Sequence, residues 1–286
     1  MAEGVTVLKV NRPNRQARRR RGKSDPADAD AEARAVLAQE ATGIPKATNG
    51  TVEAVRLLRL ARRSAMKART EAANQIHSVI DTAPEELRAQ LLVLPMSVRI
   101  PRCSRFRPGD VASPVGAAKL ALASLARRWC ALDAEIETLS GELGRLVATA
   151  APTLVAVKGV GTEVAGALLT AAGDNPERLA TEASFAALCG ASPIDASSGR
   201  NKRHRLNRGG DRQANCALFT VVLNRLTWDE RTRAYMARRT AEGKSKREVI
   251  RCLKRYVARE LYREIRKISV QIQAESLPAE VSQDAA

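Results

Sequence analysis

The sequence predicts a mainly α-helical protein, and three observations indicate this fold class. Aromatic residues make up only 3% of the 286 residues. Alanine is abundant, which suits helices that pack through small and aliphatic side chains better than a β-sandwich. Apolar residues recur at spacings of three and four between positions 122 and 146, the period of an amphipathic helix. The only strand signal near the start is the short β-branched run Val5–Val10. We therefore expect helices and at most the remnant of a sheet.

The first 50 residues are expected to form a strand, a polar loop and a helix. Val5–Val10 is the expected strand, and a lone strand is not stable, so its neighbours must be missing or come from another chain. Ser24 or Asp25 suits the N-cap of the following helix, and Pro26 suits its first turn. The alanines that follow have high helix propensity. We expect a chain that lacks the front of its first domain.

Two carboxylates, Asp25 and Asp28, stand three residues apart at the start of this helix and so share one face. Carboxylates there can hold Mg²⁺, which prefers oxygen ligands and commonly works on substrate phosphates. The alternative is that they only complement the positive end of the helix dipole. A cationic run precedes them, and its residues expected to bind phosphate are Arg18, Arg19, Arg20, Arg21 and Lys23. Phosphate-binding charge thus stands beside a candidate metal site.

The middle of the chain is expected to hold two long helices. The first should run from about Val52 to Asp81, after a break around Gly43–Gly50. Prolines at 84, 95, 101 and 108 then indicate an irregular stretch. From Ala117 apolar residues fill four successive pairs of a and d positions: Leu122, Leu125, Trp129, Leu132, Ile136, Leu139, Leu143 and Leu146. We expect this helix to pair, either in a hairpin with the 52–81 helix or in a coiled coil between chains, although a solitary amphipathic helix would show the same stripe.

The charge balance indicates a polyanionic partner. Lys and Arg number 48 against 31 Asp and Glu, a net charge of +17, and the basic residues concentrate near the N-terminus and through positions 200–267. Each phosphate that is neutralised releases condensed counterions, so nucleic acid is the first candidate. The chain has neither an apolar stretch of about 18 residues nor a secretion signal, and no helix joins a lysine-rich face to a bulky apolar face. We expect a cytoplasmic protein without membrane association.

The cysteines do not indicate a metal site. Five cysteines are scattered without a Cys-x-x-Cys pair, and His77 and His204 stand alone. We therefore expect neither structural zinc nor a disulfide framework. The cysteines suit the role of small buried apolar residues.

A break at Ala151–Pro152 opens the C-terminal part, which begins with a candidate phosphate-binding turn. Residues 154–168 show an apolar helix, a Gly-x-Gly turn and a second apolar helix, the pattern of a helix-hairpin-helix. Lys158, Gly159 and Gly161 would lie at the turn, where exposed N–H groups attract a phosphate oxygen without base specificity. A dinucleotide-binding turn would need a preceding strand and a third glycine. A purely structural turn is the other alternative.

A serine-containing loop follows, crowded by cations. Ser197 and Ser198 precede Gly199, and the basic residues expected to bind nucleic acid are Arg200, Arg203, Arg205, Arg208 and Arg212. Serine is a weak nucleophile without a base or a preorganised electrostatic site, and guanidinium groups suit a phosphoryl transition state. Such a loop is often only a connection. Gly209–Gly210 ahead of Asp211 indicates another helix, with an anion site at its N-terminus.

The last basic helices, 231–267, interleave cations with Tyr235, Tyr256 and Tyr262. A solvated face would explain some of these charges, but their density exceeds what solubility requires. We interpret this span as a surface that follows a nucleic-acid backbone.

Three segments in this order resemble the DEDD-type insertion-sequence transposases of the IS110 family. They are Val10–Ala29, the turn Gly159–Gly161 and Ser197–Asn215. The resemblance extends from about Val5 to Lys267. It implies residues 1–50 as the C-terminal remnant of a RuvC-like, RNase H-like α/β nuclease domain and 51–150 as a helical or coiled-coil region. It further implies 151–270 as the transposase domain with the helix-hairpin-helix, leaving 271–286 as a disordered tail.

The resemblance also implies roles for the candidate residues. Asp25 and Asp28 match the last two of the family's four acids, so they would bind Mg²⁺. Ser198 matches the serine that forms a covalent link to DNA, with Ser197 as the alternative. Members work as assemblies guided by a structured RNA, so the element's DNA, a guide RNA and further copies of the chain are the implied partners, and one site can combine residues of different subunits. The first two acids should precede Val5 and are absent, so we expect a truncated or mis-started chain with impaired strand cleavage.

The leading hypothesis is therefore a DNA transposase or recombinase that cuts and rejoins strands by Mg²⁺-assisted phosphoryl transfer through a serine. The alternative is a non-catalytic, helical nucleic-acid-binding protein. A basic scaffold that associates with ribosomes or RNA is a third, weaker hypothesis.

Overall fold

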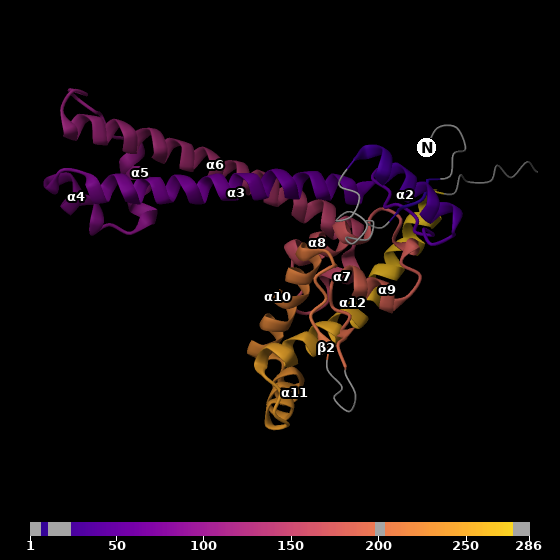
Figure 1. Cartoon of the computed structure of the whole chain (residues 1–286). Coiled ribbons are helices and arrows are strands. Elements are labelled where there is room, and N and C mark those ends of the chain that lie inside the picture. Colours follow the sequence, from indigo (N-terminus) through magenta and orange to yellow (C-terminus); the bar gives the residue numbers. More distant parts are fainter. Residues whose placement is uncertain (1–6, 11–23, 198–203, 277–286) are drawn as a thin grey trace, which may run out of the picture. The chain divides into compact units, whose positions relative to one another are not determined.

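The computed structural model describes residues 7–10, 24–197 and 204–276, and it confirms a mainly α-helical protein (Figure 1). The chain divides into two compact units. One comprises Ala54–Val155, and the other combines Met1–Glu53 with Ala156–Ala286. None of the described helices is both long enough and apolar enough to cross a lipid bilayer.

The unit 54–155 is built on two long helices, α3 (Thr51–Thr82) and α6 (Pro114–Ala150). Arg62 Nε donates to Ser140 Oγ over 2.6 Å. Further along α3, Arg69 pairs with Asp133 and its guanidinium lies 5.4 Å from the centre of the Trp129 ring. A later residue of α3 therefore contacts an earlier residue of α6, so the two helices are antiparallel. Of the two predicted pairings, the structure has the hairpin within one chain.

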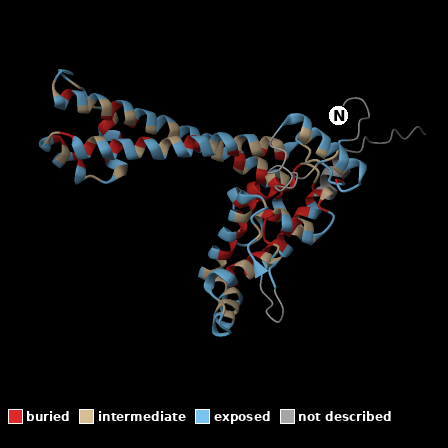
Figure 2. Ribbon diagram, in the orientation of Figure 1, coloured by how far each residue is buried: buried red, intermediate tan, exposed pale blue. Residues whose placement is uncertain are grey.

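The apolar stripe of α6 faces the interior of this unit, as its period predicted. Leu122, Ile136 and Leu143 are buried and the other members are half-buried. Leu122 and Ala126 form one core with Ile76 and Ile80 of α3. The buried residues lie along the facing sides of both helices (Figure 2).

The prediction of an irregular stretch after α3 is wrong. This stretch contains two short helices, α4 (Glu85–Leu92) and α5 (Met96–Ser104). Pro84 and Pro95 occupy the N-cap positions, where a missing N–H costs no helical hydrogen bond. The buried guanidinium of Arg99 donates to the carbonyls of Leu91 and Leu94 over 3.0 and 2.7 Å. It thereby connects the end of α4 to the turn that leads into α5. Of the four prolines of this described stretch, at 84, 95, 101 and 108, only Pro101 lies inside a helix.

A one-turn helix, α7 (Pro152–Val155), ends the first unit. The C-terminal part of the other unit contains α8 (Thr162–Ala172), the 3₁₀ turn η1 (Pro176–Arg178), α9 (Glu182–Leu188), α10 (Arg212–Trp228), α11 (Glu230–Ala241) and α12 (Lys246–Ser276). Helix α10 packs against α8, α11 and α12, and α12 also packs against α9 and η1. Large side chains that are fully buried in this core include Leu168, Phe185, Leu218 and Leu261.

The N-terminal segment 24–53 contains α2 (Asp25–Leu37), which starts as predicted with Ser24 as its N-cap. The carboxylate of Asp174 accepts from the amides of Val52 and Glu53 over 2.8 and 3.2 Å, and Asn175 accepts from Ala47 over 2.8 Å. These bonds attach the end of the segment to the region after α8.

The predicted strand Val5–Val10 is not formed over its described residues, 7–10. These contain a single antiparallel bridge, in which the Lys9 amide donates to the Gly43 carbonyl over 2.7 Å. Two paired residues cannot bury the alternating side chains of a strand, so this prediction requires correction.

Candidate nucleic-acid interface

A small β-hairpin carries residues 196–203, which we call the serine loop. Strands β1 (Ile194–Asp195) and β2 (His204–Arg205) pair antiparallel, with Ile194 opposite Arg205 and Asp195 opposite His204. Residues 196–203 therefore connect two paired strands. Ser197 is exposed at the start of this connection. Ser198, Arg200 and Arg203 lie outside the described residues, as do Arg18, Arg19, Arg20, Arg21 and Lys23.

The first turn of the connection is closed by Asp195. Its Oδ1 accepts the Ser197 amide over 2.9 Å and also accepts the Ser197 hydroxyl. These bonds stabilise the ionised carboxyl and, with the nearby His204, hold the pKa of Asp195 below its usual value. A carboxylate with a lowered pKa is a weak base near neutral pH, so Asp195 orients the Ser197 hydroxyl but does not strongly activate it.

A cationic cavity of about 440 Å³ adjoins this hairpin. Residues 190–193, which precede β1, and residues 204–207, which comprise β2 and the two residues after it, form part of its wall. Helices α11 and α12 and the turn between them supply the rest. Glu248 is the carboxylate in its lining. The cations in the lining are Arg205, Arg239, Lys244, Arg251, Lys254, Arg255 and Arg259. The hairpin that carries the serine loop is thus part of a strongly basic cavity.

Carboxylates of neighbouring residues neutralise only some of this charge. Glu182, at the start of α9, pairs with Arg255 and with Arg259, the latter over 3.1 Å. Glu242 pairs with Arg239, and an oxygen of Glu248 lies 3.8 Å from Arg251. The cavity therefore retains an excess of positive charge that a phosphate group would offset.

Lys254 is the buried cation of the cavity, with only 6% of its surface exposed. Its Nζ atom donates to Oδ1 of Asn215 over 2.8 Å, so its polar contact is a neutral amide. Burial lowers the pKa of Lys254, and the nearby Arg251 lowers it further. The negative charge of a bound anion would favour the protonated amine and so raise the pKa of Lys254 again. Sequence reasoning missed this residue, although Lys254 interrupts the apolar stripe Ile250, Val257 and Leu261.

Helix α10 begins next to the cavity, as Gly209–Gly210 predicted. The N-cap Asp211 accepts from the amides of Gln213 and Ala214 over 2.8 and 2.9 Å. The predicted anion site at this helix start is therefore filled by the chain's own carboxylate, and that prediction is wrong. Arg205, Arg208 and Arg212 are all exposed nearby, as a phosphate contact would need.

The predicted helix-hairpin-helix has a shorter first helix than expected. Helix α7 ends at Val155, and a turn leads to α8, for which Gly161 is the N-cap. Gly159 has a φ angle of +91°, a backbone conformation that residues other than glycine rarely adopt. Helix and turn precede these glycines, so the strand that a dinucleotide-binding turn requires is not there.

Lys158 already has an aromatic partner. Its Nζ lies 3.9 Å from the centre of the Trp228 ring, and its carbonyl accepts from Arg225 over 3.4 Å. A cation over an indole ring is attracted to it. Lys158 is exposed, so a phosphate contact remains a prediction that competes with this interaction.

Asp25 and Asp28 both lie in the first turn of α2, where Asp25 is exposed and Asp28 is half-buried. Their oxygens are the donor type that Mg²⁺ prefers. Within the described ranges, however, no group of three or more His, Cys, Asp and Glu side chains could hold a metal ion. A metal at this pair would need water or further ligands to complete its coordination.

The remaining predicted residues have structural roles or none in the site. Tyr262 donates to the Leu179 carbonyl over 2.8 Å and its ring lies 5.9 Å from that of Phe185, so it belongs to the core and not to a binding surface. Cys103 and Cys189 are buried as predicted, and burial raises the pKa of Cys189 to about 12. Cys130 and Cys216 are exposed, contrary to prediction.

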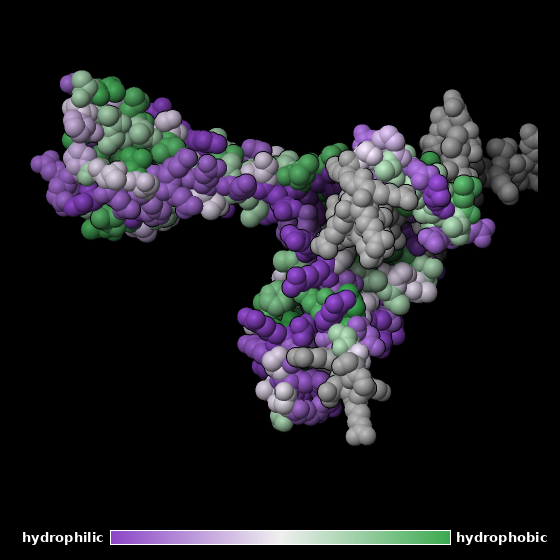
Figure 3. Space-filling view, in the orientation of Figure 1, coloured by the Kyte–Doolittle hydropathy of each residue, from purple (hydrophilic) through white to green (hydrophobic). Residues whose placement is uncertain are grey.

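Taken together, the described fold and cavity define a helical protein with a strongly basic cavity on its surface. Hydrophilic side chains predominate on the visible face of α11, which contributes to this cavity (Figure 3). Residues 151–237 match the model of the transposase IS116/IS110/IS902 family. This match spans the turn at Gly159, the hairpin and most of α11, and it supports an insertion-sequence transposase, a DNA-binding class of protein. No match was found among curated proteins.

Proposed function

We propose that this chain is a DNA transposase that cuts and rejoins strands by phosphoryl transfer through a serine nucleophile. The observation that carries the proposal is the position of the hairpin. Strand β2, which pairs with the strand that leads to Ser197 and the adjacent Ser198, belongs to the wall of a cavity lined by arginine and lysine. A backbone phosphate held by those cations would lie close to a serine hydroxyl.

In the proposed reaction, the Oγ atom of Ser198 attacks the scissile phosphorus, with Ser197 as the alternative. The bond from phosphorus to the leaving sugar oxygen breaks, that oxygen takes up a proton, and the serine proton passes to solvent or a base. The serine-linked phosphate is still a diester, so a hydroxyl of a second strand can attack it and release the serine. Strands are thereby exchanged without net hydrolysis.

The arginines of the cavity would act as electrostatic stabilisers. Charge builds up on the non-bridging phosphate oxygens in the transition state, and preorganised guanidinium groups offset it. Arg205 directly follows His204 in β2 and lines the cavity, so it is the described cation nearest in sequence to the serine loop. Arg208 and Arg212 would bind flanking phosphates.

Mg²⁺ is the proposed cofactor, held by Asp25 and Asp28, and when bound it would polarise a phosphate oxygen. Two carboxylates are a small donor set, so we expect weak Mg²⁺ binding and weak strand cleavage by one chain alone. Further copies of the chain in a homo-oligomer would supply more donors. A guide RNA is the proposed source of target choice, and the cytoplasm the proposed location.

The test is a strand-cleavage assay on donor-end DNA with Mg²⁺ and the element's RNA, in which the covalent protein–DNA adduct is separated on a denaturing gel. Ser198→Ala should abolish the adduct and Ser197→Ala should retain it. Asp25→Ala and Asp28→Ala should reduce it at limiting Mg²⁺. An adduct that survives in the Ser197→Ala, Ser198→Ala double variant would sink the serine mechanism.

A non-catalytic nucleic-acid-binding protein is the second candidate. It is favoured by the donor set, because in the described parts of the chain no third His, Cys, Asp or Glu side chain joins Asp25 and Asp28 to complete a metal site. This candidate predicts tight binding of DNA or RNA without any adduct, even with RNA and Mg²⁺ present. The same assay therefore separates the two functions.

A further inference from the structure

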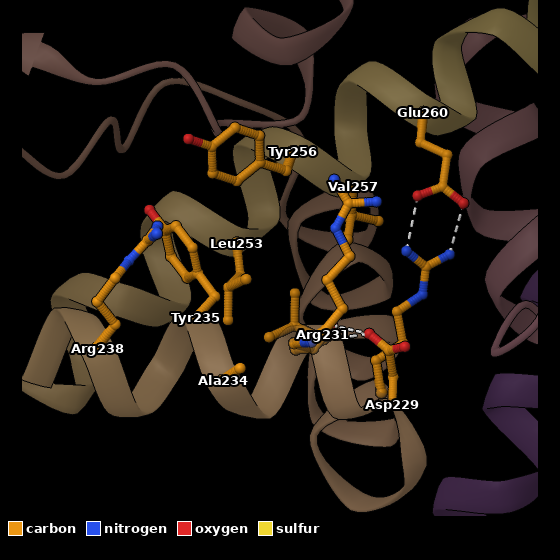
Figure 4. A pocket seen from close by; sticks show the side chains of 12 residues that line it. Asp229, Arg231, Ala234, Tyr235, Arg238, Leu253, Tyr256, Val257 and Glu260 are labelled. Carbon is orange, nitrogen blue, oxygen red and sulfur yellow. Dashed lines mark hydrogen bonds and ion pairs between the residues drawn. The ribbon is translucent and has the colours of Figure 1, made fainter.

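A second cavity, of about 860 Å³, lies between α10, α11 and α12 (Figure 4). Its lining is partly apolar, because Val222, Ala234, Leu253 and Val257 all contribute to it. In Figure 4 the rings of Tyr235 and Tyr256 lie at one end and Glu260 at the other. A cavity with an aromatic wall and a partly apolar lining suits a flat group with an aromatic face.

The tyrosine pair joins this cavity to the cationic one. Tyr235 and Tyr256 line both cavities. Their ring centres are 5.6 Å apart and their planes meet at 82°. Tyr256 is nevertheless 51% exposed, so part of its ring has no protein contact. An exposed aromatic ring thus stands at the border between a basic cavity and a partly apolar one.

The acids around the second cavity are occupied by the protein itself. Glu260 receives two hydrogen bonds from the Arg225 guanidinium, each of 2.7 Å. Asp229 accepts the amide and the hydroxyl of Thr232, which lowers the pKa of its carboxyl. Arg231 and Arg238 also line this cavity. The described lining therefore does not present an uncompensated negative charge to an anionic ligand.

A nucleotide combines the two chemistries that these cavities provide, a flat base and a charged phosphate. We propose that the two cavities together bind an unpaired nucleotide of a single-stranded nucleic acid, with its base against Tyr256 and its phosphate among the cations around Lys254. This inference rests on the proposed function and names the form of nucleic acid that the protein holds. Every base has an aromatic face, so recognition is independent of sequence.

A duplex does not fit this arrangement without distortion. Its bases are stacked on one another, so a base can reach Tyr256 only if it is first unstacked, which costs a few kcal/mol. A DNA strand opened for exchange and a loop of RNA both offer unpaired bases. The shared ligand is therefore the unpaired nucleotide, and the two sources are separated by experiment.

The test uses the full chain and fluorescence anisotropy with labelled 12-mers of thymidine and of abasic deoxyribose phosphate. One stacked base is worth about 1–3 kcal/mol, so the wild-type chain should prefer the thymidine strand by about fivefold or more. Tyr256→Leu should remove most of this preference and leave the affinity for the abasic strand unchanged. Tyr256→Phe, which keeps the ring, should retain it.

Phe219→Leu is the matched control, because Phe219 is an exposed aromatic on α10, with 38% of its surface accessible, outside the linings of both cavities. It should retain the preference for thymidine. A 5-iodouracil base in the strand should cross-link on irradiation to a peptide that contains Tyr256. Thermal unfolding of each variant checks that it is folded.

Equal binding of thymidine and abasic strands by the wild-type chain would overturn the inference, as would an unchanged preference in Tyr256→Leu. A 12-mer of uridine identifies the source, since preference for RNA indicates a guide and preference for DNA indicates a substrate strand. Ser198→Ala should keep the base preference. A failure of the serine mechanism would therefore leave this result intact, and the two proposals can fail separately.

Discussion

The Nζ atom of Lys254 on α12 donates a hydrogen bond of 2.8 Å to Oδ1 of Asn215 on α10. The Asn215 side-chain amide in turn donates to the carbonyls of Cys189 and Gly190 over 2.8 and 3.2 Å. These carbonyls precede the hairpin that presents the serine loop. One chain of hydrogen bonds thus connects the buried cation of the cavity to the backbone that leads to the candidate nucleophile.

Lys254→Met should weaken binding of a 12-mer of thymidine at low salt by about tenfold, because it removes a buried cation that would face a phosphate. The slope of log affinity against log salt should fall by about 0.7 for a single strand, the contribution of one phosphate contact. Fluorescence anisotropy between low and moderate salt measures both quantities. Lys267→Met is the control, since Lys267 on the same helix is exposed, pairs with Glu264 over 2.9 Å and does not line the cavity. Equal losses in the two variants would contradict a specific role for Lys254.

Gly210→Ala should destabilise the unit that contains residues 156–286, whereas Gly209→Ala should be tolerated. A Cβ atom on Gly210 would lie 2.2 Å from the nitrogen of Gly190 and 2.8 Å from the carbonyl oxygen of Leu188, both backbone atoms. On Gly209 it would meet only the Asn207 side chain, at 3.3 Å. Relief of the first clash requires a backbone shift, which costs on the order of 1–3 kcal/mol or more. Denaturant unfolding of the two variants measures the difference, and similar midpoints would show that the close approach of Gly190 and Gly210 is unimportant.

The ion pair of Arg225 and Glu260 should couple α10 to α12 by about 1 kcal/mol. Its geometry is bidentate, with both bonds at 2.7 Å, and the Arg225 side chain is only 14% exposed, although Glu260 is half-exposed. Solvent screening at Glu260 keeps the expected value modest. A double-mutant cycle of Arg225→Met and Glu260→Gln, followed by chemical denaturation, isolates the coupling. Additive effects of the two substitutions would mean that the pair contributes nothing measurable.

Local rules predicted much of the fold. The N-cap at Ser24, the apolar stripe of α6 and the glycines before α10 could each be predicted from one short segment of sequence. The structure confirms all three predictions. The prolines at 84 and 95 led to the wrong prediction of an irregular stretch, because a proline that stops one helix can also stand at the start of the next. The apolar spacing of Leu87, Leu91, Ile100 and Cys103, all buried, was the signal for α4 and α5 that proline obscured.

The cavity was harder to predict because its residues are distant in sequence. Tyr256 and Lys254 lie on α12, Asn215 on α10 and Glu182 on α9, and only packing of these helices brings them together. The sequence indicated a basic surface through this region but not which cation is buried. Nor could it show that Lys158 would rest on Trp228, seventy positions later.

Ser197→Ala should raise the pKa of the Asp195 carboxyl toward its usual value. The Ser197 hydroxyl and amide both donate to this carboxylate and are the largest causes of its lowered pKa. The folded pKa lies below the unfolded one. The carboxylate therefore stabilises the turn fully above the unfolded value, near pH 4, and this contribution is lost as the pH falls through the folded pKa.

An NMR titration of the Asp195 side chain in wild type and Ser197→Ala measures this shift. Asp229 provides the internal control, because Thr232 lowers its pKa in the same way and the substitution should leave that value unchanged. Loss of the turn in acid should also speed amide exchange at Ser197 in the wild-type chain. If the Asp195 pKa does not move on substitution, the carboxylate does not hold the first residue of the serine loop. The hydroxyl of Ser198 would then have to be oriented by the DNA itself and not by the hairpin.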